Sequence, residues 1–224
     1  MRQHLLCDGD DTLWQNNVYF ERAIAQFIAL LDHSTLGPAE VRAVLDEIEG
    51  RHGYGSANFA RSLQECYARL AEREPRAEDR DAVAALARRV AEHPLEVIPG
   101  VRETLDELSR RHALVLVTKG AVEEQRLKID GSGLADYFTH VLIVPEKRAA
   151  TYGAIATLFD LDPRATWMIG NSPRSDINPA LAAGLNAVYI PHPDTWSLEH
   201  EDVAERDDGR LLTLAAFAEL RDRF

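Results

Sequence analysis

The sequence predicts an α/β protein in which a parallel sheet lies between two layers of helices and an all-helical segment is inserted after the first strand. Three observations lead to this fold class: a short apolar strand near the N-terminus, a long stretch of helical periodicity, and then a regular alternation of helices and strands. The chain has 224 residues, which suffices for one large domain or for a core with a smaller second domain.

The first strand is expected at His4–Cys7, a mostly apolar segment that runs into the polar turn of residues 8–11. This pattern is typical of a buried parallel strand that delivers side chains at its carboxyl end. From residue 16 to about residue 92, apolar residues recur at helical spacing, as Phe20, Ile24 and Phe27 do. This stretch is therefore expected to be an all-helical insertion.

After Pro99 and Gly100 the pattern changes to alternating helices and strands. A helix is expected around residues 101–111, and strands are expected at residues 113–117, 139–144, 166–169 and 187–190. Such alternation predicts a Rossmann-like, three-layer core whose ligands bind beyond the carboxyl ends of the strands. The expected domains are a core of residues 1–14 and 97–224 and a helical domain of residues 15–96. The acidic stretch of residues 199–208 is expected to form a surface loop.

Composition narrows the range of partners and compartments. Lys and Arg number 25 against 37 Asp and Glu, a net charge of −12 that argues against binding nucleic acid. No apolar run approaches the roughly 18 residues of a membrane helix, and carboxylates stand where a signal peptide needs apolar residues. A cytoplasmic protein without a membrane partner is expected. Cys7 and Cys66 are the two cysteines of the chain and lack Cys-x-x-Cys spacing, so neither a disulfide framework nor a thiolate zinc site is expected.

Four polar clusters fall at the ends of the expected strands, where a parallel sheet would bring them together. They are Asp8, Gly9, Asp10, Asp11 and Thr12; Thr118, Lys119 and Gly120; Lys147; and Gly170, Asn171 and Ser172 with Asp176 close behind. Phosphate-ester chemistry needs a nucleophile, a proton donor for the leaving oxygen, and positive charge for the phosphoryl oxygens. The clusters supply each of these parts.

Asp8 and Asp10 are two residues apart, so both carboxylates project to the same side of an extended strand end, where Mg²⁺ can bridge them. One can attack phosphorus while the other donates and then accepts a proton. Lys147 can provide a positive charge, with Lys119 and Arg148 as alternatives for that role.

Further donors and ligands come from the remaining clusters. The Thr118 hydroxyl and the backbone N–H groups of Thr118, Lys119 and Gly120 can bind phosphoryl oxygens. Asn171 and Asp176 offer further oxygens to the metal.

The order of these motifs resembles that of the haloacid dehalogenase-like (HAD) superfamily of hydrolases: Asp-x-Asp-x-Thr at residues 8–12, Thr118 at the end of the second strand, Lys147, and a Gly-Asp-x-x-x-x-Asp-type motif at residues 170–176. The resemblance covers residues 1–14 and about 97–224, and the helical insertion stands where this superfamily carries its C1-type cap. It implies that Asp8 is the nucleophile and Asp10 the general acid and base. A true dehalogenase resembles this pattern but lacks the second aspartate.

The resemblance further implies that Thr118 and Lys147 bind phosphate, and that Asp176 and the position of Asn171 form the metal side of the site together with Asp8 and Asp10. Asn171 stands where an aspartate is usual. Asn can still offer a carbonyl oxygen to Mg²⁺, but one negative charge is missing, so weaker metal binding is expected.

The expected function is Mg²⁺-dependent hydrolysis of a small phosphorylated metabolite through an aspartyl-phosphate on Asp8, by a monomer or a homodimer. Two alternatives remain open: a phosphomutase that returns the phosphate to a second hydroxyl, and a binding or regulatory protein without turnover, which Asn171 alone supports. Asn17, near the first motif, and Tyr54, in a loop flanked by glycines, are candidates for substrate specificity.

Overall fold

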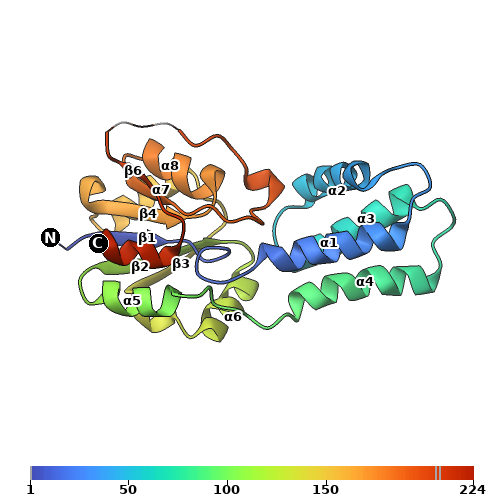
Figure 1. Cartoon of the computed structure of the whole chain (residues 1–224), viewed down its shortest axis with the longest axis horizontal. Helices are drawn as coiled ribbons and strands as arrows, with labels where there is room; N and C mark the ends of the chain where they lie inside the picture. Colours follow the sequence, from blue (N-terminus) through green and yellow to red (C-terminus); the bar gives the residue numbers. More distant parts are fainter. Residues whose placement is uncertain (1, 205, 207) are drawn as a thin grey trace. The chain divides into compact units, whose positions relative to one another are not determined.

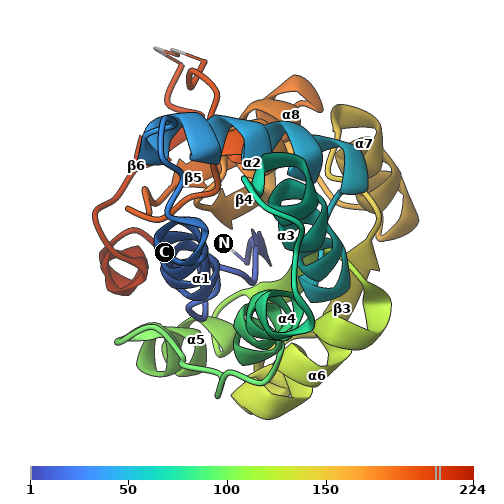
Figure 2. The same ribbon diagram turned by 90° about the vertical axis from the view of Figure 1, so that its right-hand side faces the viewer.

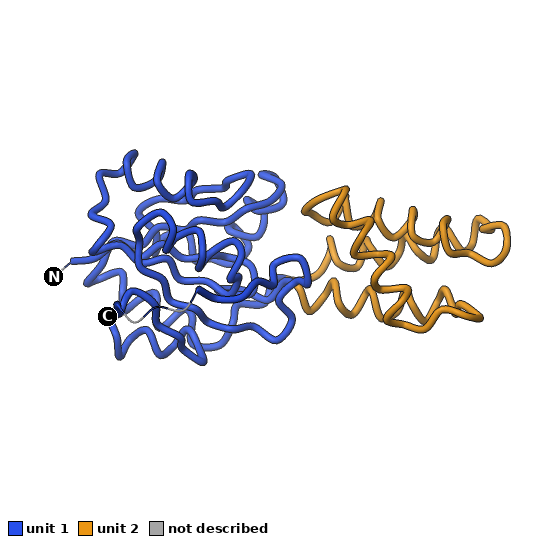
Figure 3. Tube along the Cα trace, turned by 90° about the horizontal axis from the view of Figure 1, so that it is seen from above, with its two compact units in different colours: residues 1–16, 95–224 blue, residues 17–94 orange. Residues whose placement is uncertain are grey.

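The chain forms two compact units, as the computed structural model of residues 2–204, 206 and 208–224 shows (Figure 3). Unit 1 comprises Met1–Asn16 and Leu95–Phe224, and unit 2 comprises Asn17–Pro94. Each boundary differs by two residues from the one expected from the sequence. In the described ranges, no helix has the length and apolar character needed to cross a membrane.

Unit 1 is built on a sheet in which, within the described residues, six strands follow the order β3-β2-β1-β4-β5-β6 and all neighbours are parallel (Figure 1). The strands are β1 His4–Cys7, β2 Ala113–Lys119, β3 His140–Val144, β4 Thr166–Gly170, β5 Asn186–Tyr189 and β6 Leu211–Thr213. The predicted α/β, Rossmann-like core is confirmed, with every predicted strand within two residues of its expected bounds. The edge strand β6 was not predicted, because three residues are too few to show a periodic pattern.

Helices cover both faces of this sheet (Figure 1, Figure 2). They are α5 Val101–Ser109, α6 Val122–Ser132, α7 Ala149–Leu158 and α8 Asn178–Ala182. Side chains alternate between the two faces along β1: Leu5 belongs to the core formed with α5 and α6, and Leu6 to the core formed with α7 and α8. Burial of apolar side chains on both faces explains why the strands read as continuous apolar runs.

Unit 2 is all helical, as the periodicity of this stretch predicts. Its helices are α1 Asn17–Leu31, α2 Pro38–His52, α3 Ser56–Leu70 and α4 Ala77–Ala91. Each helix contributes to one apolar core, with Phe27, Leu45, Leu63 and Leu86 among the buried residues. The four helices therefore bury their apolar faces against one another.

The strand register brings the polar clusters together. Cys7, the last residue of β1, pairs with Leu116 of β2 on one side and with Ile169 of β4 on the other. Asp8, Thr118 and Gly170 therefore lie at the same carboxyl edge of the sheet.

Beyond β4, the single π-helical turn Pro173–Ile177 folds back on the end of the strand. The carboxylate of Asp176 in this turn lies so close to Gly170 that a Cβ atom on residue 170 would collide with it. Only glycine fits at residue 170 without movement of that carboxylate.

Gly170→Ala is expected to lower the free energy of unfolding of unit 1 by about 1–3 kcal/mol, the usual cost of an overpacked site. The matched control is Gly153→Ala in α7, where a Cβ atom would meet nothing within 4 Å and the change should be neutral or stabilising by up to about 1 kcal/mol. Urea unfolding followed by tryptophan fluorescence measures both, because Trp14, Trp167 and Trp196 all lie in unit 1. Equal stability of the two variants would show that Asp176 moves aside at no cost.

Candidate active site

The turn after β1 holds the first candidate carboxylate at the centre of the sheet edge. Asp8 follows β1 directly, is buried, and donates its backbone N–H to the carbonyl of Ile169 in β4 at 2.9 Å. Gly9 allows the chain to turn here, since a Cβ atom on it would lie 2.7 Å from the ring of Trp14. The hydroxyl of Thr12 lies 3.3 Å both from Oδ2 of Asp8 and from Oδ1 of Asn171. The Thr12 hydroxyl thus lies between an oxygen of Asp8 and an oxygen of Asn171, which belong to different motifs.

A buried lysine joins the first and last motifs. Lys147, between β3 and α7, donates from Nζ to Oδ1 of Asp8 and, at 2.7 Å, to Oδ1 of Asp176. Its side chain is 1% exposed, so these two carboxylates and one ammonium group meet almost without water. Lys119 instead forms an ion pair with Glu199, and the side chain of Arg148 is exposed. Of the three cations considered for this role, Lys147 is the one that the structure places on Asp8.

The charges of this cluster do not balance. Burial and the nearby charge of Asp176 raise the pKa of Asp8 to about 7, against the lowering effect of the Lys147 ammonium. Burial opposes the charge of Lys147, but Asp176 and Asp8 outweigh it and raise the pKa of the ammonium, which stays protonated. Two carboxyl groups thus face one ammonium group, and a cation bound beside them would lower the pKa of Asp8 again.

The oxygens around this cluster fit a hard divalent cation. Besides the carboxylate of Asp8, Asp176 contributes a carboxylate, and its Oδ2 accepts the backbone N–H of Ser172 at 3.0 Å. Asn171 donates from Nδ2 to Thr195 at 3.0 Å, which leaves Oδ1 turned toward Thr12 and Asp8. Among the described residues, no group of three or more His, Cys, Asp or Glu is arranged to hold a metal, so the carboxylates of Asp8, Asp10 and Asp176 do not form one such group. Oxygen ligands of this kind suit Mg²⁺.

Asp10 lies in a different environment. Its Oδ1 accepts from Nε1 of Trp14 at 2.7 Å, its Oδ2 accepts from Nε2 of Gln125 at 2.9 Å, and Nζ of Lys128 lies 3.0 Å from both oxygens. Burial opposes the charge of Asp10, but Lys128 and these hydrogen bonds outweigh it and hold the pKa below its ordinary value. Gln125 and Lys128 were not singled out in the sequence, although their spacing of three residues on α6 places both on one helix face.

The second motif lies at the end of β2. Thr118 is buried and donates its hydroxyl to Oε1 of Gln125 at 3.1 Å. Gly120 has a φ of 138°, a conformation that favours glycine. The ammonium of Lys119 donates to Oγ of Ser175 at 2.6 Å and to Oε1 of Glu199 at 2.5 Å. The phosphate-binding roles of Thr118, Lys119 and Gly120 stay predictions.

The expectation that residues 199–208 form a solvated loop is wrong for Glu199; residues 205 and 207 lie outside the described part of the chain. Glu199 is buried, and its Oε2 accepts hydrogen bonds from Oγ of Ser172 at 2.6 Å and Oγ of Ser175 at 2.5 Å. Burial opposes its charge, but Lys119 and the two serines outweigh this effect and lower the pKa of Glu199. An acidic residue in an acidic stretch gives no sequence signal of burial, because glutamate is rarely buried.

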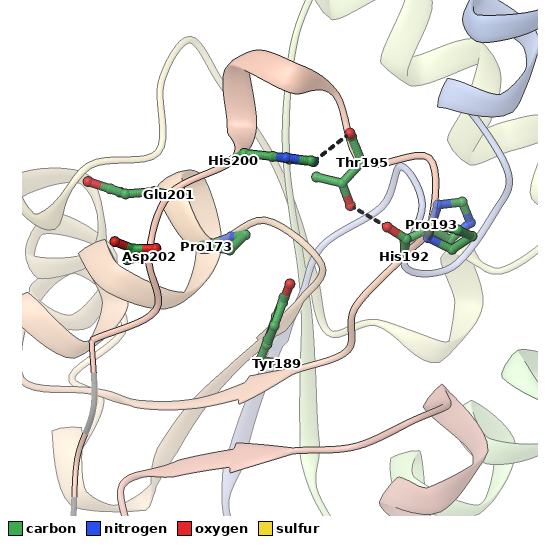
Figure 4. A pocket seen from close by; sticks show the side chains of 8 residues that line it. All are labelled: Pro173, Tyr189, His192, Pro193, Thr195, His200, Glu201 and Asp202. Atoms are coloured by element: carbon green, nitrogen blue, oxygen red, sulfur yellow. Dashed lines mark hydrogen bonds between the residues drawn. The ribbon is translucent and has the colours of Figure 1, made fainter.

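A cavity of about 600 Å³ opens in unit 1 beyond the ends of β4 and β5 (Figure 4). Its described lining residues are Pro173, Tyr189, His192, Pro193, Thr195, His200, Glu201 and Asp202. Thr195 donates its hydroxyl to the carbonyl of His192 at 2.9 Å and accepts from Asn171 at 3.0 Å. Thr195 therefore both lines the cavity and contacts Asn171.

The two specificity candidates belong to unit 2. Asn17 is the first residue of α1, and Tyr54 lies between α2 and α3. Their role in substrate selection stays a prediction.

Comparisons with known proteins identify the family of this chain. A family model described as haloacid dehalogenase-like hydrolase matches residues 3–184. A phosphoserine phosphatase from Thermus thermophilus is 30% identical over 161 residues, which cover 69% of this chain and 55% of that protein. The chain thus spans little more than half the length of that relative.

Two solved structures extend the comparison. A haloacid dehalogenase-like family hydrolase from Xanthomonas campestris is 34% identical, with a TM-score of 0.88 over 99% of this chain and 94% of that one. A 2-haloacid dehalogenase from Pseudomonas syringae is 21% identical, with a TM-score of 0.58 over 99% of this chain and 97% of that one. At that identity the second likeness shows the fold alone.

Glu199→Gln is expected to destabilise unit 1 by about 3 kcal/mol, because it removes the charge that faces Lys119 in a buried ion pair. Glu201→Gln, which changes an exposed neighbour, should stay within about 0.5 kcal/mol of the wild type. Urea unfolding followed by tryptophan fluorescence at neutral pH compares the two variants.

The pH dependence of this difference follows from the lowered pKa of Glu199. A lowered pKa in the folded state stabilises the protein above the unfolded value of about 4.3 and loses this effect as the pH falls below it. The difference in the free energy of unfolding between the wild type and Glu199→Gln should therefore be largest at neutral pH and decrease below about pH 4.3. A gap that does not change with pH would show that Glu199 is not held as a carboxylate.

Proposed function

The chain belongs to the haloacid dehalogenase-like hydrolase family, and on this basis we propose that it is a Mg²⁺-dependent phosphatase that hydrolyses a small phosphomonoester through an aspartyl-phosphate on Asp8. The observation that carries the proposal is the buried cluster in which Lys147 bridges the carboxylates of Asp8 and Asp176 at the carboxyl edge of the sheet. The similarity to a phosphoserine phosphatase over 161 residues supports phosphate as the group removed.

In the first step, a carboxylate oxygen of Asp8 attacks phosphorus and the ester P–O bond breaks. The electron pair of that bond goes to the leaving oxygen, which takes a proton from Asp10 and departs as an alcohol. Lys147 supplies positive charge to the phosphoryl oxygens, and Thr118 supplies a hydroxyl donor.

In the second step, Asp10 accepts a proton from a water molecule while the water oxygen attacks phosphorus. The bond between phosphorus and Asp8 breaks, which releases inorganic phosphate and restores the carboxylate of Asp8. The proton that Asp10 gave to the alcohol is thereby replaced, so each turnover begins from the same state.

The residues proposed to hold Mg²⁺ are Asp8, Asn171 and Asp176, with Asp10 as a further expected ligand. When bound, Mg²⁺ supplies positive charge that offsets the negative charge of the phosphoryl group and the carboxylates. The raised pKa of Asp8, caused by burial and by Asp176, supports such a cation beside it. Without the neutralising charge, the carboxylate and a phosphoryl dianion repel each other.

Release of inorganic phosphate from a panel of sugar phosphates, nucleotides and small phospho-acids, in the presence of Mg²⁺, tests the proposal. Asp8→Asn is expected to reduce turnover below about 1% of the wild type while preserving the fold, because it removes the nucleophile at nearly constant size. The control is Asp160→Asn, an exposed position with a φ of 51° that asparagine tolerates, which should keep full activity. Release of halide from 2-chloropropionate in place of phosphate would overturn the phosphatase assignment.

A magnesium titration tests the role of Asn171. Asn171→Asp restores an anionic oxygen at constant size and should lower the Mg²⁺ concentration that gives half-maximal activity. Asn171→Ala removes the oxygen and should raise that concentration, which gives the opposite sign as an internal control. The added charge of Asn171→Asp should also raise KM for a dianionic substrate. If both variants titrate as the wild type does, Asn171 lies outside the metal site.

A further inference from the structure

The side-chain amide of Asn171 can be turned in two ways, and one of them presents an oxygen to a cation. A carboxylate offers an oxygen in either orientation, but an amide has an oxygen on one branch and an NH₂ group on the other. Oδ1 of Asn171 lies 3.3 Å from the hydroxyl of Thr12, which also contacts Asp8, and Nδ2 lies 3.0 Å from Oγ1 of Thr195. The orientation of this amide therefore decides whether residue 171 can serve as a metal ligand.

The hydrogen bonds of Thr195 determine this orientation. Its hydroxyl has one proton, which it donates to the carbonyl of His192 at 2.9 Å. Toward Asn171 the hydroxyl oxygen can then only accept, so the NH₂ group of the amide has to face it. With the amide turned over, its oxygen would meet the lone pairs of Thr195 unless Thr195 gave up the bond to His192. Either result costs a hydrogen bond.

Thr195 is held in place by backbone contacts on both sides (Figure 4). Its N–H donates to the carbonyl of His192 at 3.2 Å, and its carbonyl accepts from Nε2 of His200 at 2.9 Å. Nδ1 of His192 accepts the backbone N–H of Asp194 at 3.3 Å, so the proton of the neutral ring lies on Nε2, which contacts Oε1 of Gln15 at 3.1 Å. These contacts use the backbone of residue 195, so they remain when its side chain is changed.

We infer that Thr195 is a positioning residue that turns the amide of Asn171 so that its oxygen, and not its NH₂ group, faces the proposed Mg²⁺ site. The inference rests on the proposed function, because it takes Asn171 as a ligand of that Mg²⁺. It gives a reason why an asparagine can stand at this position. An aspartate needs no partner to present an oxygen, whereas an asparagine needs a neighbour that accepts from its NH₂ group.

The first test measures the orientation itself and needs neither metal nor turnover. In a nitrogen-15-labelled sample, Asn171→Asp identifies the side-chain NH₂ signal of Asn171 by removing it. In the wild type, the nuclear Overhauser contacts of this NH₂ group should be to Thr195. In Thr195→Val, which keeps the shape of the side chain but removes the acceptor, contacts to the methyl group of Thr12 should appear. Contacts to Thr12 already present in the wild type overturn the inference.

The second test measures Mg²⁺ binding by calorimetry without substrate. Thr195→Val should bind Mg²⁺ about three- to tenfold more weakly than the wild type, the range that one hydrogen bond supplies. Thr195→Ser keeps the hydroxyl and should bind within about twofold of the wild type. The matched control is Thr157→Val on α7, an exposed position whose hydroxyl bonds to the carbonyl of Gly153 in the same helix. Urea unfolding verifies that each variant folds, and an unchanged affinity in Thr195→Val overturns the inference.

A double variant separates positioning from a general loosening of the loop. In an Asn171→Asp background, Thr195→Val should change the Mg²⁺ affinity less than about twofold, because a carboxylate presents an oxygen however it is turned. A loosened loop would weaken Mg²⁺ binding equally in both backgrounds. Equal losses with Asn and with Asp at residue 171 therefore contradict the role of Thr195.

The third test uses phosphate release. Thr195→Val should raise the Mg²⁺ concentration that gives half-maximal activity about three- to tenfold, while kcat at saturating Mg²⁺ stays within about twofold of the wild type. A loss of kcat that saturating Mg²⁺ does not restore contradicts a positioning role.

The outcomes distinguish this inference from the proposed function. A wild type that binds Mg²⁺ but releases phosphate from no substrate overturns the phosphatase assignment, and the calorimetric comparison still decides the role of Thr195. A wild type that binds Mg²⁺ as tightly as Thr195→Val does overturns the inference alone. A wild type that binds no Mg²⁺ overturns both.

Discussion

The ion pairs of Lys147 with Asp8 and Asp176 are the constraint on which the rest of the site depends. Two carboxylates and an ammonium group are costly to remove from water, and loss of the ammonium would leave two buried carboxylates without a counter-charge. The cost is tolerated because β1 and β4 are paired neighbours and because Gly170 lets the Asp176 turn fold against the strand end. The charge cluster therefore requires that the carboxylate of Asp176 lie close to the backbone of Gly170.

The two aspartates of the first motif differ in their surroundings, and their pKa values move in opposite directions. Asp8 lies beside another carboxylate, and burial together with Asp176 raises its pKa. Asp10 lies among donors, where Lys128, Gln125 and Trp14 lower its pKa against the effect of burial. In carboxyl pairs that divide these roles, the proton donor has the raised pKa and the nucleophile is ionised. The shifts here run the other way, so the proposed roles require that a cation beside Asp8 lower its pKa and that the charge of a bound phosphoryl group raise the pKa of Asp10.

The sequence predicts the parts of the site that follow strands. Buried parallel strands have a strong apolar pattern, so the positions of Asp8, Thr118 and Asn171 at their ends follow from it. Gln125 and Glu199 could not be found this way. Gln125 is recognisable only in the structure, where it contacts both Thr118 and Asp10. Glu199 is buried against Ser172 and Ser175, which precede it by 27 and 24 positions in the chain. Long-range contacts of polar side chains leave no periodic signal in the sequence.

The charges of the described site support the cation proposed for phosphate chemistry. Lys119 faces Glu199, Lys128 faces Asp10 and Glu124, and Lys147 faces Asp8 and Asp176. Three ammonium groups therefore face five carboxylates. The lysines alone therefore give this edge no net positive charge, and a phosphoryl dianion would add to the excess negative charge. A divalent cation on the oxygens of Asp8, Asn171 and Asp176 would offset the charge that the dianion brings. An asparagine at residue 171 would then keep an oxygen for the cation without a further carboxylate charge that the incoming phosphate would have to overcome.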